Sequence, residues 1–382
     1  MSGSHSGHKR LRGAVVGYGF ISSRGHVPAY LERAQRRRDV EIVAVADICA
    51  ARRDYARRDL PGARIYSDHH SLLDSEARNL DFVDICTPPS DHAEIARQAL
   101  ERGLHVLCEK PLAPTLGEAS SLLENAARAR RVIFPCHNYK HAPVVKAIRE
   151  ILRDGSIGRV QSVTLSTFRN TYARGAPEWK PHWRRERRYS GGGIAMDHGS
   201  HTFYLAFEWM GAYPTAVSAK MSSLGPGQYD TEDNFSAVLT FPSGLAHAHL
   251  SWTAGVRKVI YTLQGERGAI TVDDDNLELA IAPGMAAMTN GNGKWSVEKR
   301  SVASHWMDAS HIQWFNSLFD EFKTAIQEGA FVGKEARDAY FCIQTISSAY
   351  QSADEGCREL PLSTEIGWAE RWFPMNRIPI GR

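Results

Sequence analysis

The sequence has no uninterrupted apolar run of the roughly 18 residues that a membrane-spanning helix needs, so we expect no membrane span. Its first residues, Met1–His8, are polar and lack the apolar core of a secretory signal, so we expect residues 1–9 to form a disordered tail. The six cysteines include no Cys-x-x-Cys pair. Cys86 and Cys108 fall in apolar strands, which indicates reduced, buried thiols and a cytoplasmic protein.

The chain also has little net charge, +3 at neutral pH. Its arginine clusters, such as Arg36–Arg38, are interleaved with acids or end apparent helices, which is typical of solvated faces. No nucleic-acid-binding motif accompanies them, so we expect no nucleic-acid partner. His247 and His249 alternate along one strand, but no acid or cysteine accompanies them at ligand spacing, so we predict no metal site.

The chain is long and its elements alternate regularly. Its 382 residues exceed one ordinary hydrophobic core, and its composition, 43% hydrophobic and 23% charged, is typical of globular proteins. Strands alternate with helices over residues 10–142, which predicts an α/β domain with a doubly wound parallel sheet. Residues 143–382 are predicted to form an α+β domain with a large, mostly antiparallel open sheet, in which two late apolar stripes are core helices.

A glycine-rich turn follows the first predicted strand, Leu11–Val16. The segment Gly17-Tyr18-Gly19-Phe20-Ile21-Ser22 then leads into a helix, which is the context of dinucleotide binding in the Rossmann fold. Gly17 would make the tight turn, and Gly19 would let a pyrophosphate approach the helix N-terminus. The second strand ends in Asp47, which is placed to accept hydrogen bonds from a ribose and to repel a 2′-phosphate. This favours NAD, while Arg52–Arg53 leave NADP open.

Other chemically useful residues follow the later strands. Thr87, Lys110 and Asn138 each stand at a strand end, where ligands bind on parallel sheets. Lys110 is either a surface cation paired with Glu109 or a donor to a substrate oxygen. We favour the second reading, in which the fixed ammonium stabilises charge that develops during hydride transfer.

The stretch Gly191–His201 is the most informative part of the second half. Its three glycines let the backbone approach another group closely, and the apolar segment after it predicts a buried helix that ends at Gly211. Asp197 and His201, four residues apart, would share one helix face and could act together as a general base on a hydroxyl. The alternative is an acid near the helix dipole and a buried, hydrogen-bonded histidine. His198 is expected to point elsewhere.

The loop Trp179–Arg184 precedes the glycines and mixes aromatic rings with cations. Aromatic faces suit the apolar sides of a sugar ring, and Lys180 or Arg184 could meet an acid or phosphate group. The alternative is a surface loop that its tryptophans order.

Several motifs occur together in a fixed order: Gly17-x-Gly19, Thr87-Pro88, Glu109-Lys110-Pro111, Asn138-Tyr139-Lys140, and Gly192-Gly193 before Asp197-x-Gly199-x-His201. In this combination the chain resembles the glucose–fructose oxidoreductase/inositol dehydrogenase/rhizopine catabolism (Gfo/Idh/MocA) family over nearly its whole length. The resemblance implies a nicotinamide-dependent oxidoreductase that acts on sugars or cyclitols. Many relatives carry arginine where Lys140 stands, and lysine lacks the planar fork for bidentate binding.

The resemblance also implies three sets of site residues. The catalytic group carries over onto Lys110, Asp197 and His201. The predicted cofactor-binding residues are Gly17, Gly19, Phe20, Ile21, Asp47, Thr87, Pro88, His92, Glu109, Lys110 and Asn138. The predicted substrate-binding residues are Lys110, Lys140, Trp183, Arg184, Asp197 and His201.

We therefore predict hydride transfer between NAD, with NADP left open, and a secondary alcohol or ketone of a polyol or sugar. By analogy with the family we expect a homodimer or homotetramer. Two alternatives from other classes stay open: an NAD-dependent redox-neutral glycosidase, and a non-catalytic regulator that senses a dinucleotide or a sugar. The intact set of Lys110, Asp197 and His201 argues against the regulator.

Overall fold

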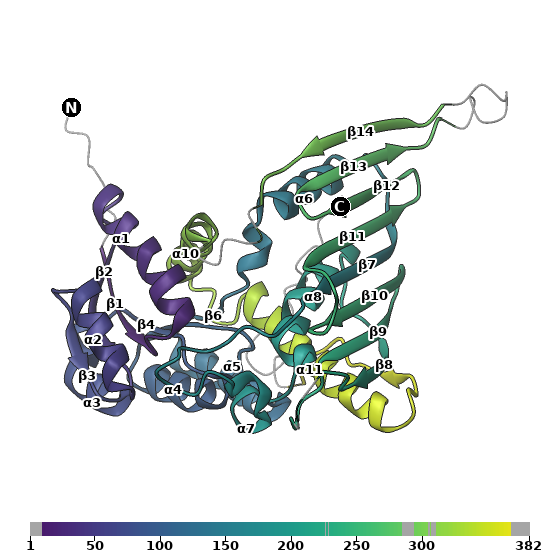
Figure 1. The fold of residues 1–382 in the computed structure, drawn as a ribbon. Coiled ribbons are helices and arrows are strands. Elements are labelled where there is room, and N and C mark those ends of the chain that lie inside the picture. Colours follow the sequence, from purple (N-terminus) through teal and green to yellow (C-terminus); the bar gives the residue numbers. More distant parts are fainter. Residues whose placement is uncertain are drawn as a thin grey trace, which may run out of the picture.

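The computed structural model describes residues 10–225, 227, 229–284, 294–304, 306 and 311–367. The tail predicted over residues 1–9 lies outside them. The described chain forms a six-stranded sheet and a nine-stranded sheet, which stand in separate halves of the molecule (Figure 1). None of its described helices is both long and apolar enough to cross a membrane.

The first sheet is parallel throughout and has the strand order β3-β2-β1-β4-β5-β6. Its strands are β1 (Leu11–Val16), β2 (Val40–Ala46), β3 (Arg64–Tyr66), β4 (Phe82–Ile85), β5 (His105–Cys108) and β6 (Ile133–Pro135). The strand order reverses between β1 and β4, and ligands of doubly wound sheets bind at such a point. The predicted Rossmann architecture is confirmed.

Helices connect these strands: the π-helix η1 (Ser22–His26), α1 (Val27–Arg36), α2 (Ala50–Asp59), α3 (His69–Glu76), the 3₁₀ turn η2 (Ala77–Asn79), α4 (Pro89–Glu101) and α5 (Leu116–Ala129). Thr115 caps α5, since its hydroxyl accepts from the Glu118 N–H at 3.3 Å and contacts the Glu118 carboxylate at 2.6 Å. Asp91 and Glu94 also have the spacing of a capping box, but Asp91 does not cap its helix. The helix α4 begins at Pro89, a residue suited to the first helical position, so Asp91 lies within the first turn.

The second sheet has the order β14-β13-β12-β11-β7-β10-β9-β8-β15. Its strands are β7 (Val160–Phe168), β8 (Ala216–Ser222), β9 (Asn234–Phe241), β10 (Gly244–Ser251), β11 (Lys258–Gly265), β12 (Gly268–Asp273), β13 (Asn276–Ile281), β14 (Ser296–Ser301) and β15 (Leu360–Pro361). All pairs are antiparallel except β7 with β10, so the prediction of a mostly antiparallel sheet is confirmed. His247 and His249 lie on its exposed face.

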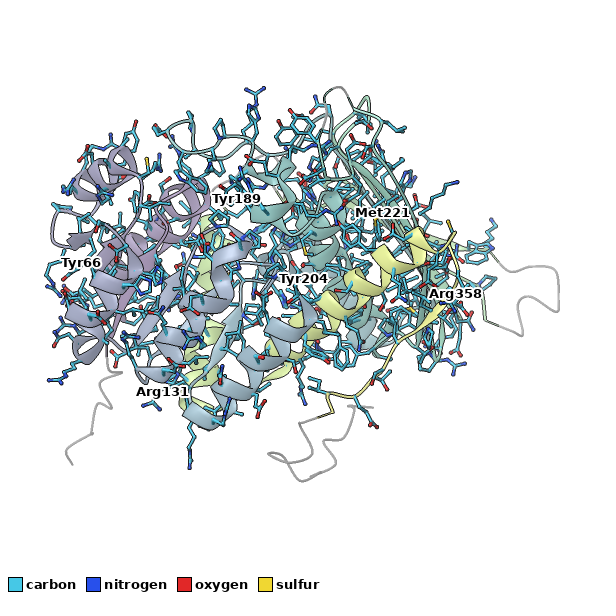
Figure 2. All side chains as sticks on the ribbon, turned by 90° about the horizontal axis from the view of Figure 1, so that it is seen from below. Tyr66, Arg131, Tyr189, Tyr204, Met221 and Arg358 are labelled. Atoms are coloured by element: carbon cyan, nitrogen blue, oxygen red, sulfur yellow. The ribbon has the colours of Figure 1, made fainter. Side chains whose placement is uncertain are left out.

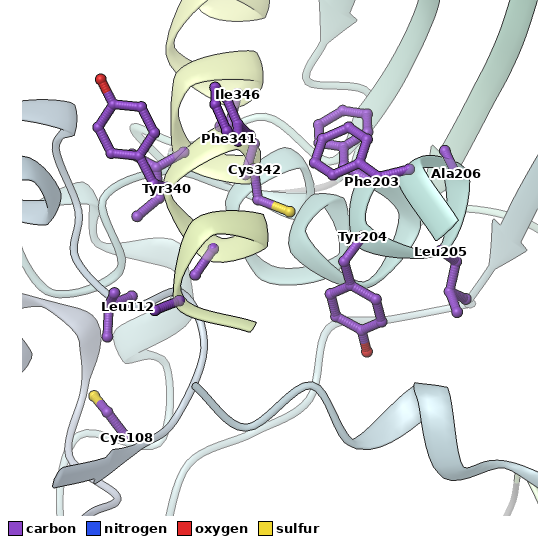
Figure 3. Packing of buried hydrophobic residues seen from close by; sticks show 14 of the residues in the cluster. Cys108, Leu112, Phe203, Tyr204, Leu205, Ala206, Tyr340, Phe341, Cys342 and Ile346 are labelled. Atoms are coloured by element: carbon purple, nitrogen blue, oxygen red, sulfur yellow. The ribbon is translucent and has the colours of Figure 1, made fainter. Parts of the chain in front are cut away.

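The remaining helices are the 3₁₀ turn η3 (Asn138–His141), α6 (Pro143–Asp154), the 3₁₀ turn η4 (Trp183–Arg185), α7 (Arg187–Ser190), α8 (Ile194–Met210), α10 (Ile312–Glu328) and α11 (Lys334–Asp354). The helix α8 is buried along most of its length between the nine-stranded sheet and α11. Figure 3 shows Phe203 of α8 in this layer, with Cys342 of α11 pointing toward α8. The predicted buried helix ending at Gly211 is confirmed, although it begins before Asp197.

The helix α10 links the two halves. It comes late in the chain but lies beside α1 of the first half (Figure 1). Its buried residues Phe319 and Phe322 pack edge-on or tilted against Phe82, and Phe319 also packs against Tyr30. The apolar stripe that predicted this helix is therefore a core stripe, and it completes the core of the first half.

Candidate active site

A cleft of about 660 Å³ runs along the carboxyl edge of the parallel sheet and is closed on its other side by α8 and the segment after β7. Residues after β1, β2, β4 and β5 line it, as do residues from 169–201. The strand-end residues that sequence alone grouped together therefore share one cavity.

The glycine turn forms one wall of this cleft. Gly17 has a φ of +90°, and a Cβ there would lie 2.8 Å from the Cys86 backbone, so the turn requires glycine. A Cβ on Gly19 would meet no atom within 4 Å, because the position faces the open cleft. Phe20 and Ile21 continue the wall. The turn offers bare backbone to the cleft, which fits the approach of a pyrophosphate.

Asp47 lines the cleft just after β2. Its carboxylate accepts from the Tyr18 N–H at 2.6 Å and the Cys49 N–H at 2.7 Å. Burial raises the pKa of Asp47 above its ordinary value. Arg52 donates to the Tyr18 carbonyl at 2.6 Å and to the Ser23 hydroxyl at 3.1 Å. The carboxylate is thus fixed where a ribose is expected. Of the two arginines that left NADP open, Arg52 donates to the glycine turn and Arg53 donates to the Asp47 carbonyl at 2.8 Å.

Most of the predicted cofactor-binding residues line the cleft: Gly17, Gly19, Phe20, Ile21, Asp47, Thr87, Pro88, Glu109, Lys110 and Asn138. The buried Thr87 hydroxyl has no hydrogen-bond partner among the described residues. His92 is the exception. It is fully buried behind the cleft wall, where its ring nitrogens lie 2.8 Å from the carbonyl oxygens of Thr87 and Pro111. The predicted cofactor contact of His92 is corrected to a supporting contact, because both its nitrogens are engaged by the loops behind the wall.

Glu109 is held from behind by a buried polar cluster. Its Oε1 lies 3.0 Å from His26 Nε2, and its Oε2 accepts from the Lys110 N–H at 3.1 Å. His26 Nδ1 lies 2.8 Å from Asp84. Burial alone would lower the pKa of His26, but Asp84 outweighs it and raises that pKa well above its ordinary value. Sequence reasoning missed His26 and Asp84, although an acid inside an apolar strand was a usable signal.

Lys110 reaches from the first half of the molecule to α8. Its Nζ donates to the main-chain oxygen of Asp197 at 2.7 Å and to Asp197 Oδ1 at 3.0 Å. Arg184 Nε lies 3.4 Å from the same Oδ1. Burial alone would raise the pKa of Asp197, but Lys110 and then Arg184 hold it well below its usual range. Lys110 thus places its ammonium against an ionised carboxylate in the first turn of α8. The alternative in which Lys110 is a surface cation paired with Glu109 is wrong.

His198 occupies the side of Asp197 that Lys110 leaves free. Its Nδ1 lies 3.2 Å from Asp197 Oδ2, and its side chain lines the cleft. The expectation that His198 points elsewhere is therefore wrong. Adjacent helix residues point about 100° apart, but Asp197 is short and lies in the first turn, so its second oxygen stays within reach of the next ring.

His201 shares a helix face with Asp197, as the spacing predicts, but the two side chains make no hydrogen bond among the described residues. Its Nδ1 lies 2.7 Å from the Tyr204 hydroxyl, which also accepts from the Tyr139 N–H at 3.1 Å. The imidazole stacks on the Tyr139 ring at 3.9 Å. Burial, followed by the charge of Lys110, keeps the pKa of His201 well below its ordinary value. The expected pairing of Asp197 with His201 as a joint general base is corrected: Tyr204 and Tyr139 hold this ring, because cations engage the carboxylate.

Tyr204 lies deep between the halves of the molecule. Figure 2 labels it near the centre, with Tyr66 of the first sheet on one side and Met221 of the second sheet on the other. Burial raises the pKa of Tyr204 well above its ordinary value, so its hydroxyl keeps a proton at neutral pH. A phenol hydroxyl both donates and accepts, so it can support either neutral tautomer of His201.

Two of the three glycines, Gly192 and Gly193, explain why α8 starts where it does. A Cβ on Gly193 would lie 1.8 Å from the Glu232 carbonyl oxygen, and one on Gly192 would lie 2.0 Å from the Tyr350 hydroxyl. The Glu232 carboxylate accepts from the N–H groups of Gly193 at 3.0 Å and Ala195 at 2.9 Å, and Tyr350 donates to it at 2.9 Å. The close approach predicted for the glycines is made to the protein itself, and it fixes the helix turn that carries Asp197.

Lys140 does not line the cleft. Its buried ammonium lies 2.7 Å from both Glu335 and Asp338 of α11. Burial alone would lower the pKa of Lys140, but the two carboxylates raise it above its ordinary value. The predicted substrate contact of Lys140 is thus replaced by a structural one, because the side chain turns from η3 into the acid pair rather than toward the cavity.

Trp183 and Arg184 line the cleft as predicted, with the Arg184 guanidinium 4.2 Å from the Trp183 ring centroid. Lys180 is not among the lining residues, and its ammonium lies over the Tyr189 ring instead. Sequence reasoning missed five further lining residues of interest: Tyr139, Arg169, Tyr172, Arg257 and Trp306. Of these, only Tyr139 belonged to a quoted motif.

Two family models match the chain. Residues 11–137 match the oxidoreductase family with an NAD-binding Rossmann fold, and residues 145–271 match the GFO/IDH/MocA C-terminal domain. Among curated relatives, the D-glucoside 3-dehydrogenase of Escherichia coli (strain K12) is 24% identical over 366 residues, which cover 91% of this chain and 97% of that protein. Levoglucosan dehydrogenase of Pseudarthrobacter phenanthrenivorans is 27% identical over 72% of this chain and 77% of its own.

A solved structure of levoglucosan dehydrogenase in complex with NADH has the same fold, with a TM-score of 0.79 and 22% identity. The match covers 94% of this chain and 100% of that one. GenD2 from gentamicin A biosynthesis, solved with NAD, gives a TM-score of 0.74 at 25% identity, over 93% of this chain and 97% of its own. Both sheets of this chain therefore occur together in solved proteins.

Proposed function

The chain belongs to the Gfo/Idh/MocA family of oxidoreductases, with an NAD-binding Rossmann domain, and from this premise we propose that it is a dehydrogenase acting on a secondary alcohol of a sugar or cyclitol. The observation that carries the proposal is the contact of Lys110 with Asp197 in a cleft that also holds His201. An ammonium, a carboxylate and a neutral imidazole in one cavity are the groups that moving a hydroxyl proton requires.

The cofactor side of the cleft supports NAD. The glycine turn gives a phosphate access to backbone, and the fixed Asp47 carboxylate has lone pairs left for ribose hydroxyls. When NAD is bound, its nicotinamide supplies the hydride acceptor. The Thr87 hydroxyl, buried without a partner, is a donor and acceptor available at this end of the cleft.

Lys110 would bind the reacting oxygen of the substrate. Its ammonium has three protons, of which two are already directed to Asp197, so one remains for a substrate oxygen. A cation beside a hydroxyl favours loss of its proton, and the same cation stabilises negative charge on that oxygen in the transition state. Asp197 orients Lys110 and offsets part of the positive charge around it.

His201 would accept the hydroxyl proton at the ring nitrogen that does not contact Tyr204. Its depressed pKa keeps it neutral at neutral pH, which a base requires. The balanced reaction moves one hydride from the carbinol carbon and one proton from its oxygen, and leaves a ketone. In the reverse direction the same residues return the proton.

The test is near-ultraviolet absorbance of the purified protein with NAD or NADP and a panel of inositols, hexoses, amino sugars and sugar phosphates. We expect NAD reduction with one substrate class, and its loss in Lys110→Met. Release of the leaving group from an aryl glycoside without net NADH would instead establish the redox-neutral glycosidase. Cofactor binding without turnover on any compound would favour the regulator.

A further inference from the structure

Two arginines that no motif predicted stand together at one end of the cleft. Arg169 directly follows β7, and Arg257 directly precedes β11. These strands are antiparallel neighbours in which Phe168 pairs with Lys258. The two arginines therefore occupy adjacent positions where the two strands end on the same side of the sheet. Arg169 donates to the Phe168 carbonyl at 2.8 Å and to the Lys258 carbonyl at 3.4 Å. Both side chains line the cleft.

Neither arginine has an acidic partner among the described residues. Arg169 is only 7% exposed, yet within the described residues its side chain donates only to main-chain carbonyl oxygens. Arg257 donates to the Trp306 carbonyl. Burial and then the like charge of Arg169 lower the pKa of Arg257 below its ordinary value. The negative charge of Asp274 acts to raise the pKa of Arg257. The Asp274 carboxylate itself accepts a hydrogen bond from the Val259 N–H at 2.8 Å.

The balance of charge on this side of the cleft is positive. The second half of the molecule contributes Arg169, Arg184 and Arg257 to the lining but only one carboxylate, Asp197. Asp197 already faces both Lys110 and Arg184. Gathering guanidinium groups without a counter-charge costs free energy, and a bound anion would relieve that cost through charge-assisted hydrogen bonds.

Neighbouring aromatic rings connect Trp306, whose carbonyl Arg257 contacts, to His201. The Trp306 ring lies 5.2 Å from the Tyr139 ring, and Tyr139 stacks on His201 at 3.9 Å. A ligand that spans from Arg257 to His201 would therefore lie beside aromatic faces, which suit the apolar faces of a sugar ring.

We infer that the substrate is an anionic polyol, that is, a sugar or cyclitol with a carboxylate or phosphate group, whose anion binds Arg169 and Arg257 while a secondary hydroxyl reaches Lys110 and His201. The inference rests on the proposed dehydrogenase function and names its substrate class. The anionic group takes no part in the reaction: hydride leaves the carbinol carbon for NAD, the hydroxyl proton goes to His201, and the anion only anchors the ring.

The test compares matched pairs of substrates with NAD: a hexose with its hexuronate, the same hexose with its 6-phosphate, and inositol with an inositol monophosphate. We expect kcat/KM of the anionic member to exceed that of its neutral partner by about 10- to 100-fold. The uronate and phosphate arms identify which anion the site takes. Added salt should reduce the ratio only modestly, because the site is partly buried.

The variants are Arg257→Met and Arg169→Met, with Arg174→Met as control. Arg174 is an exposed arginine between two lining residues and is not itself among them. Both test variants should lower the anionic-to-neutral ratio of kcat/KM at least tenfold, and the control should leave the ratio unchanged. Arg257 lies at the exposed rim, so its variant keeps the test informative if Arg169→Met does not fold.

A binding measurement accompanies the rates. Quenching of NADH fluorescence is titrated with gluconate, glucitol and inorganic phosphate in the wild type and in Arg257→Met. Tighter binding of an anion than of glucitol, lost in the variant, supports the inference. Equal use of both members of every pair, or a ratio that survives both variants, overturns the inference and leaves the dehydrogenase in place. Absence of cofactor reduction with every compound overturns the proposed function itself.

Discussion

Lys110 Nζ lies 2.7 Å from the main-chain oxygen of Asp197 and 3.0 Å from its Oδ1. This contact joins the end of β5, in the parallel sheet, to the first turn of α8, in the other half of the molecule. The position of the ammonium in the cleft therefore depends on a residue 87 positions later in the chain.

Asp197→Asn keeps the side-chain size but removes the charge that faces Lys110 and Arg184. The cations are then uncompensated and Lys110 is less firmly oriented, so we expect kcat/KM to fall by roughly 10²-fold or more. NADH binding, followed by fluorescence, should stay near the wild-type value. Asp91→Asn, at an exposed position of the same cleft, is the control. Wild-type turnover in Asp197→Asn would rule out the role assigned to this pair.

His201 should titrate well below pH 6.5, because burial and the charge of Lys110 both disfavour its imidazolium. Lys110→Met removes one of these effects, so the pKa of His201 should rise in the variant. NMR of isotope-labelled histidine measures this without turnover. Lys334→Met, at an exposed position on α11, should leave the signal unchanged. A fall in the pKa of His201, or no change, would contradict the electrostatic effect of Lys110 on this ring.

The acid limb of the pH profile of kcat/KM follows from the lowered pKa of His201. A neutral base is lost as pH falls through its pKa, so the limb that His201 causes should lie below the ordinary histidine range, and activity should persist at about pH 6. A limb centred near 6.5 or above would show that a group other than His201 carries the proton.

Lys140→Met should destabilise the fold, because it removes the buried ammonium that Glu335 and Asp338 share and leaves only weaker partners for these two carboxylates. We expect a loss of about 3–5 kcal/mol at neutral pH in denaturant unfolding. Lys140 holds the pKa of Glu335 well below its usual range against the effect of burial, so this stabilisation is present above the unfolded pKa and lost as pH falls. The difference between wild type and variant should therefore shrink toward acid pH. Lys334→Met is a matched control, since Lys334 also contacts Asp338 but is 58% exposed, and it should cost at most about 1 kcal/mol.

Gly193→Ala should lower both stability and activity. Its Cβ would lie 1.8 Å from the Glu232 carbonyl oxygen, so the start of α8 must shift, and Asp197 with it. We expect a loss of at least about 1–3 kcal/mol. Gly199→Ala is the matched control on the same helix, because its nearest contact would be 3.4 Å from Ile346. That variant should stay within about 1 kcal/mol of the wild type. Equal thermal unfolding of the two variants would show that the glycine contact is not needed.

The sequence by itself determined the strands of the parallel sheet and the wall of the cleft that the glycine turn forms. Its hydrophobic periodicity is a local property, so the strands of the parallel sheet, the glycine turn with Gly17 and Gly19, and the acid at Asp47 could be predicted from short segments. The helix face shared by Asp197 and His201 follows from helical spacing in the same way. Cleft-lining residues at the carboxyl ends of the strands follow from the rule for parallel sheets.

Only the tertiary structure decided which side chains meet across the cleft. Lys110 and Lys140 are both lysines near strand ends, yet one reaches Asp197 and the other reaches Glu335 and Asp338. Tyr204 rather than Asp197 contacts the ring of His201, and Arg169 meets Arg257 through strand pairing. Such contacts join residues far apart in the chain, and long flexible side chains choose among partners by burial and charge. No local pattern records that choice, because it depends on how the two halves pack.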